Sequence, residues 1–133
     1  MVKEKNIIVD TNAFIAISDF KLDIFSAIKD SCNFKYKLLI LEGTIKELEK
    51  ISESKKAKER KSAKLALQII EQKLANKELS LMEDHFDNVI VDDNLVYESG
   101  QGNLILTQDR DLKKRLQRPF LTIRQKKFIV MLE

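Results

Sequence analysis

Acidic residues follow two short apolar runs, one near each end of the chain. Asp10 comes directly after "NIIV", and Asp109 closely follows "LILT", with Asp111 two positions later. Runs of Ile, Leu and Val that stop at polar residues are typical of strands buried on both faces of a parallel sheet. Ligands of such sheets bind beyond the carboxyl ends of the strands. If the two strands are central neighbours, Asp10 and Asp109 lie at one rim.

Further acidic residues occur in predicted helices between these two strands. Glu47 lies in "GTIKELEKI", and Asp92 and Asp93 open "DDNLVYES". Several unpaired carboxylates at one place repel one another, so their clustering implies a bound cation. Oxygen ligands alone favour Mg²⁺ or Mn²⁺ over Zn²⁺. Two such ions about 4 Å apart can generate a hydroxide and stabilise the leaving oxygen when a phosphodiester is cleaved.

Each acidic residue also has a purely structural interpretation. Asp10 and Asp109 precede helical segments and could cap them by accepting a backbone N–H. Thr44 and Glu47 form the S/T-x-x-E pattern of a capping box, and the aspartate pair of "DDNLVYES" could cap in the same way. Capping and metal binding are compatible, because a carboxylate has more than one acceptor lone pair.

Runs typical of strands alternate with segments of helical spacing. Strands are predicted at 6–10, 37–41, 103–109 and 121–124. Helical spacing of apolar residues marks 22–28, 45–51, 63–74, 92–99 and 110–118, and the charged stretch 51–64 favours helix through its Ala and Lys content. The alternation predicts an α/β fold with a central parallel sheet flanked by helices. The last residues, 128–133, fit either an edge strand or a dimer contact.

Composition favours one cytoplasmic domain spanning residues 1–133. The chain is 44% hydrophobic, and its 24 Lys and Arg against 21 Asp and Glu leave a net charge of only +3. Cys32 is the single cysteine and His85 the single histidine, which argues against a disulfide framework and against a common zinc site. No apolar run is long enough for a membrane span, and neither a G-x-S-x-G nor a GxxxxGK[ST] motif is present. We expect no membrane association.

Two segments resemble the motifs of PIN-domain nucleases. "IIVDTNAFI" is similar to their opening motif, and "ILTQDRDL" is similar to their later T-x-D-x-D motif, with Glu47 and "DDNLV" in the expected order between them. The resemblance covers nearly the whole chain. It implies a single PIN-like domain, an α/β/α sandwich, that hydrolyses RNA phosphodiesters as an endoribonuclease with one or two Mg²⁺ or Mn²⁺ ions.

The resemblance also assigns roles to individual residues. The acidic metal-binding and catalytic quartet corresponds to Asp10, Glu47, Asp93 and Asp109. Asp111 matches an additional acidic ligand, and the supporting positions are Asn12, Thr107 and Asp92. Asp93 is preferred to Asp92 as a ligand because "DNLV" is similar to the family's D-x-L-I/V stretch. Helical periodicity does not separate the two, since both precede the apolar pair of that stretch by about one turn.

A basic segment follows the second motif. The predicted helix 110–118 carries Lys113, Lys114, Arg115 and Arg118, and beyond it come Arg124, Lys126 and Lys127. The functional interpretation is that these cations bind RNA phosphates and position the scissile bond over the metal ions. The alternative is an ordinary solvated surface, where most charged side chains lie. The phenylalanines occupy apolar positions and are predicted to belong to the core.

Several functions stay open at this point. The ending "TQDRDLKKRL…FLTIRQKKFIV" resembles archaeal relatives of the PIN nuclease that processes ribosomal RNA precursors more than VapC-type toxins. Toxins usually show a D-x-D-F motif, and here Leu112 replaces its Phe. The expected partners are then precursor ribosomal RNA, ribosome-assembly proteins and a second copy of the chain, or an antitoxin for a toxin. A non-catalytic RNA-binding or assembly module is a further alternative. A receiver-like signalling domain would need a partner lysine at a strand end, and none is convincing.

Overall fold

One sheet organises the computed structural model, which describes residues 4–87 and 89–133. The strand order is β3-β2-β1-β4-β5-β6, and β6 pairs antiparallel with β5 while the other pairs are parallel. The strands are β1 (Lys5–Val9), β2 (Tyr36–Leu41), β3 (Ser80–Met82), β4 (Leu104–Leu106), β5 (Phe120–Arg124) and β6 (Phe128–Leu132). The prediction of a central, mostly parallel sheet is confirmed.

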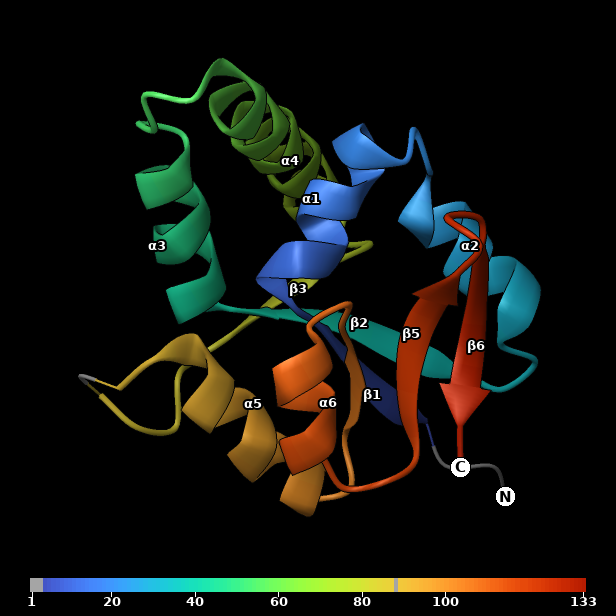
Figure 1. Ribbon diagram of the computed structural model, residues 1–133. Coiled ribbons are helices and arrows are strands. Elements are labelled where there is room, and N and C mark those ends of the chain that lie inside the picture. The colour runs from blue at the N-terminus through green and yellow to red at the C-terminus, as the bar shows by residue number, and fades with distance from the viewer. Residues whose placement is uncertain (1–3, 88) are drawn as a thin grey trace.

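Helices cover both faces of the sheet (Figure 1). One face carries α1 (Thr11–Asp19), α2 (Ile24–Ser31), α3 (Glu42–Ile51) and α4 (Ala57–Ala75), and the other carries α5 (Val91–Gly100) and α6 (Arg110–Arg115). Each face has its own apolar cluster. Phe14, Leu48 and Ile70 pack on the first, and Leu95 and Leu112 on the second. The predicted α/β/α sandwich is therefore confirmed.

Alternating side chains of one strand supply both clusters. Ile7 and Val9 of β1 belong to the larger cluster, and Ile8 between them belongs to the smaller one. All three side chains have no exposed surface. A strand covered on both faces needs apolar residues at every position, which explains the continuous run of the sequence.

The strand order reverses between β1 and β4, in the middle of the sheet. These two strands pair in parallel with Ile8 opposite Ile105 and Val9 opposite Leu106. Their next residues, Asp10 and Thr107, therefore leave the sheet side by side. A reversal point of this kind opens a crevice beyond the strand ends, where ligands of α/β sheets bind.

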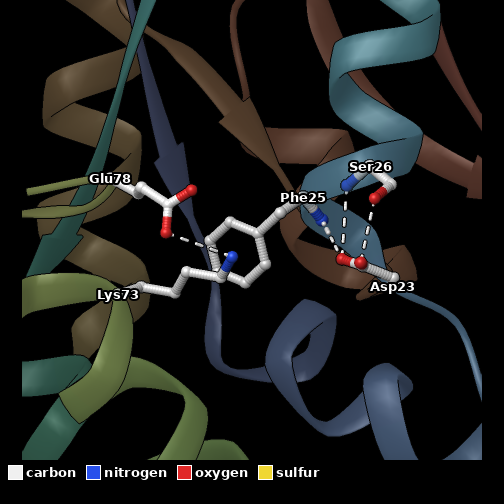
Figure 2. A network of polar contacts seen from close by, with 5 residues as sticks. All are labelled: Asp23, Phe25, Ser26, Lys73 and Glu78. Atoms are coloured by element: carbon white, nitrogen blue, oxygen red, sulfur yellow. Dashed lines mark hydrogen bonds and ion pairs between the residues drawn. The ribbon is translucent and has the colours of Figure 1, made fainter. Parts of the chain in front are cut away.

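A network far from this crevice fixes the helices of the larger layer. Asp23 caps α2 by accepting from the backbone N–H groups of Phe25 and Ser26, and the Ser26 hydroxyl donates to its second oxygen (Figure 2). Lys73 of α4 pairs with Glu78 at 3.3 Å and lies 4.8 Å from the centre of the Phe25 ring. These contacts join α2 to α4.

Several predicted boundaries differ from the structure. The predicted helix 110–118 ends at Arg115, because Leu116 turns extended and buries its side chain while the chain approaches Pro119. The stretch 52–56 interrupts the predicted helical segment 51–64. There the Ser54 hydroxyl accepts from the Lys56 N–H, a local side-chain bond that competes with the helix.

The two edge strands of the sheet were not fully predicted from the sequence. β3 was not predicted, since three residues are too short for a periodic pattern. Residues Phe128–Leu132 form the other edge strand, one of the two alternatives for the last segment.

Phe86 and Phe128 are 42% and 50% exposed, so their assignment to the core was wrong. No helix in the described part of the chain has the length and apolar character of a membrane span.

Candidate active site

Asp10 occupies the centre of the crevice between β1 and β4. It is 3% exposed and caps α1, with one carboxylate oxygen accepting from the Thr11 N–H at 2.7 Å. The other oxygen accepts from the Thr107 hydroxyl at 2.7 Å. Both oxygens are therefore held in place, one by the first residue of α1 and the other by the first residue after β4.

Burial dominates the electrostatics of Asp10. It raises the pKa of this carboxyl from 3.8 to about 7, against the opposing effect of the hydrogen bonds from Thr107 and Thr11. The negative charges of Asp92 and Glu47 raise the pKa further. The site thus holds a buried carboxyl among like charges, which is the setting that a bound cation would neutralise.

Thr107 connects Asp10 to Asp109. Its hydroxyl donates to Asp10 and accepts from the backbone N–H of Asp109 at 3.0 Å. Asp109 in turn caps α6, since one carboxylate oxygen accepts from the N–H groups of Asp111 and Leu112. Thr107 itself is fully buried. One hydroxyl therefore fixes the relative positions of two acidic residues that lie 99 positions apart in the chain.

Glu47 and Asp92 approach the same crevice from opposite faces of the sheet. Glu47 comes from α3 and Asp92 from α5, and burial followed by the charges of Asp109 and Glu47 raises the pKa of Asp92. Neither helix begins with a side-chain cap. The predicted capping box is wrong, because α3 begins at Glu42 and Thr44 lies inside it, fully buried.

Asp92, and not its neighbour, is the member of the aspartate pair that the other acidic residues face. Asp93 forms an ion pair with Arg115 at 2.7 Å, and both side chains are almost half exposed. The sequence preferred Asp93, but the charges that act on Asp10 are those of Asp92 and Glu47. We call the set of Asp10, Glu47, Asp92 and Asp109 the acidic rim.

The remaining predicted acidic and supporting residues lie at the surface beside the acidic rim. Asp111 and Asn12 are exposed. A surface hollow opens at the start of α6, lined by Gln108, Asp109, Arg110, Asp111 and Lys114. The hollow brings Asp109 to the surface beside basic side chains, so an anionic polymer could approach the rim here.

The donor set of the acidic rim fits a hard divalent cation, since every candidate donor is a carboxylate oxygen. Burial and, to a smaller extent, the charges of Asp92 and Glu47 raise the pKa of Asp10, so a cation bound there would stabilise its charged form. Within residues 4–87 and 89–133, no three His, Cys, Asp or Glu side chains are arranged as a ready metal cluster.

Several of the predicted RNA-binding cations have local partners. Arg115 pairs with Asp93, and Arg118 donates to the Glu133 carbonyl at 2.8 Å. Lys126 and Lys127 lie over phenylalanine rings, 5.7 Å and 5.6 Å from their centres. Arg118 also lies outside the helix that was predicted to carry it. The predicted helix therefore does not align four cations as expected.

Sequence reasoning missed Gln108. Its side chain acts as an extra strand partner beyond β4: the carboxamide oxygen accepts from the Ile123 N–H at 2.6 Å and the Thr122 hydroxyl at 2.9 Å. The carboxamide nitrogen donates to the Ile123 carbonyl at 3.2 Å. These bonds tie the end of β5 to the end of β4. A glutamine between two motif residues carries no signal of this role in a single sequence.

Comparisons with known proteins bear on the family and the fold of the chain. A family model described as "PIN like domain" matches residues 7–126. The chain is 30% identical over 126 residues to ribonuclease VapC4 of Methanocaldococcus jannaschii, covering 92% of each protein. It is similar to the solved structure of the PIN domain endonuclease Utp24, with a TM-score of 0.73 and 23% identity over 95% of this chain and 90% of that one. A domain of a functionally unknown M. jannaschii protein matches with a TM-score of 0.57 and 13% identity, covering 97% of this chain and 99% of that one.

Proposed function

The chain belongs to the PIN-like domain family of nucleases, and from this premise we propose that it is a divalent-metal-dependent endoribonuclease that acts at the acidic rim. One observation carries the proposal. The Thr107 hydroxyl joins the buried Asp10 to Asp109 at the point where the strand order reverses. Such a fixed pair of carboxylates is what metal-assisted hydrolysis of a phosphodiester requires.

The acidic rim supplies the candidate ligands for Mg²⁺ or Mn²⁺. Asp10 and Asp109 would hold the ion at the centre, and Glu47 and Asp92 would close around it from the two faces of the sheet. When bound, the cation supplies a water of lowered pKa for attack on phosphorus and stabilises the charge on the leaving oxygen. We prefer Asp92 to Asp93 in this role because Asp93 is paired with Arg115.

Neighbouring residues orient the carboxylates that would bind the metal ion. Thr107 keeps one oxygen of Asp10 in place by a buried hydrogen bond, and the Thr11 N–H holds the other. Asp109 is kept at the rim because its carboxylate also caps α6. Partners of this kind fix the direction of a ligating oxygen and commonly affect metal binding almost as strongly as the ligands do.

Within this activity we favour ribosomal RNA precursors as the substrate. The ending "TQDRDLKKRL…FLTIRQKKFIV" resembles archaeal relatives of the nuclease that processes these precursors. The likeness to the structure described as the PIN domain endonuclease Utp24 concerns the fold. A homodimer and ribosome-assembly proteins are the partners that this role implies.

The toxin branch is the second candidate, favoured by the 30% identity to a protein named ribonuclease VapC4. A toxin would have RNA as its substrate and an antitoxin as its partner. The gene neighbourhood separates the two branches. A small antitoxin reading frame next to this gene would favour the toxin, and its absence would favour processing.

The proposal is tested by incubating the purified protein with structured precursor RNA in Mn²⁺ or in EDTA, beside Asp10→Asn. We expect cleavage by the wild type in Mn²⁺, no cleavage in EDTA, and none by the variant. Asparagine has nearly the same shape as aspartate and its side-chain oxygen can still accept at the α1 cap, so the variant is expected to fold. Undiminished cleavage by Asp10→Asn, with contaminating nuclease excluded, would refute the assignment. RNA binding without any metal-dependent product would favour the non-catalytic module.

A further inference from the structure

A group of three cations lies on the α6 side of the acidic rim. Arg110 and Lys113 are one helical turn apart on α6, so they lie on one face of that helix. Arg124 ends β5, the strand beside β4. We propose that Arg110, Lys113 and Arg124 form a subsite for a backbone phosphate of the RNA strand, next to the scissile position. The proposal rests on the proposed function, since it places the strand relative to the acidic rim.

Gln108 fixes the position of Arg124. Leu106 lies opposite Leu121 in the sheet, and the Thr107 N–H donates to the Leu121 carbonyl. The Gln108 side chain then bonds both backbone groups of Ile123, the residue before Arg124. The end of β5 is thereby held against the residue that precedes Asp109. Arg124 is kept near α6 by a rigid connection and not by a flexible loop.

The three cations gather beyond the end of β4. Arg124 directly follows Ile123, whose backbone the Gln108 side chain bonds, while Arg110 directly follows Asp109 and begins the helix that carries Lys113. In the two described ranges, none of the three forms an ion pair with a carboxylate. A concentration of positive charge without a protein counter-ion is the arrangement that a phosphate group neutralises.

The surroundings favour this group over the other basic residues nearby. Arg115 and Arg118 are bonded to Asp93 and to the Glu133 carbonyl. Lys126 and Lys127 lie over aromatic rings. The surface hollow at the start of α6 is lined by Gln108, Asp109, Arg110, Asp111 and Lys114. A strand lying in it would therefore contact Asp109 of the rim and Arg110 of the subsite.

The test measures the binding of a labelled single-stranded oligouridylate in EDTA over a series of KCl concentrations. Wild type is compared with the double variant Lys113→Gln/Arg124→Gln and with Arg110→Gln. The matched control is Lys29→Gln/Lys37→Gln, which removes the same charge from exposed positions that line a hollow near the start of β2. Circular dichroism checks that each variant is folded.

The double variant is expected to reduce the slope of log affinity against log salt concentration by about 0.7, because the subsite holds one phosphate and each phosphate contact on a single strand contributes about 0.7. The control should keep the wild-type slope. Gln108→Leu removes no charge, yet it should reduce the slope as well, because Arg124 is no longer fixed. A slope unchanged in the double variant, or reduced equally in the control, would overturn the subsite.

Two further outcomes distinguish a test of the subsite from a test of the proposed function. With an oligodeoxythymidylate, the double variant should reduce the salt slope by the same amount, since a contact to phosphate does not involve the 2′-hydroxyl. A loss confined to RNA would overturn a phosphate subsite. Failure of the proposed function would show itself differently, as absence of Mn²⁺-dependent cleavage by wild type, whatever the salt slopes are.

Discussion

Asp10 is a buried carboxyl, and its pKa of about 7 predicts how stability depends on pH. The folded state keeps the proton up to about pH 7, whereas the unfolded chain releases it near 3.8. In EDTA, the contribution of Asp10 to the free energy of unfolding should be complete below pH 3.8 and decline as the pH rises to about 7. Urea unfolding at several pH values measures this decline.

Asp10→Asn provides the control for the pH experiment, since asparagine has no proton to release in this range. The variant should lack the part of the decline that Asp10 causes, and it should be more stable than wild type at neutral pH without metal. An identical pH profile for both proteins would contradict the assigned pKa.

The pair Asp92 and Asp93 offers a second comparison between adjacent residues. Asp92→Asn should reduce Mn²⁺ affinity by at least roughly 10- to 100-fold. This is the loss usually caused by removing a residue that only supports a metal ligand. Asp93→Asn removes only an exposed ion pair with Arg115, which contributes little. Isothermal titration with Mn²⁺ measures both variants. Equal losses, or the reverse order, would return the ligand role to Asp93.

At the scale of the secondary-structure elements, the hydrogen bonds of Thr107 hold the end of β4 to the residues of the acidic rim. Thr107→Val keeps the shape but removes the donor to Asp10 and the acceptor for the Asp109 N–H. We expect a loss of about 1–3 kcal/mol in the free energy of unfolding, because a buried polar group loses its partner. Mn²⁺-dependent cleavage should fall roughly 10- to 100-fold, as for other residues that orient a ligand.

The measurement for Thr107 combines thermal unfolding with cleavage rates over a range of Mn²⁺ concentrations. Thr122→Val is a comparison within the neighbouring strand, since Thr122 is equally buried but bonds Gln108 and not an acidic residue. It should lose stability with a smaller effect on the Mn²⁺ requirement. If both variants lose cleavage in parallel with stability, Thr107 has a structural role only.

The elements also show what a single sequence can predict. The strands β1 and β4 were predictable because they are buried on both faces, so every position had to be apolar. Because parallel strands end at the same edge of the sheet, the proximity of Asp10 and Asp109 was also predictable. β3 was missed because three residues carry no period, and α6 was predicted too long because Leu116 has a place in the core.

The choice within the aspartate pair could not be made from the sequence. Asp92 and Asp93 both lie in the first turn of α5, and only the packing of that helix decides which one faces Glu47 and Asp109. The Gln108 connection was equally hidden, since its partner Ile123 is 15 positions away in another strand. Contacts that depend on tertiary packing leave no periodic signal in a chain.

For the molecule as a whole, the three layers have a functional consequence. Glu47 belongs to a helix on one face of the sheet and Asp92 to a helix on the other, while Asp10 and Asp109 follow the two strands between them. The acidic rim therefore exists only in the complete sandwich. The cations proposed to hold phosphate lie beside it, so the small net charge of +3 conceals a separation of charge that suits an anionic substrate.

The central claim is that the acidic rim performs metal-dependent hydrolysis while nearby cations hold the RNA. Asp109→Asn tests it most directly, because asparagine caps a helix as well as aspartate does and the fold should persist. The measurement is Mn²⁺-dependent cleavage of single-stranded RNA, with RNA affinity determined in parallel. We predict that the variant binds RNA at least as tightly as wild type and yields no metal-dependent product. Cleavage at the wild-type rate by folded Asp109→Asn would contradict the account.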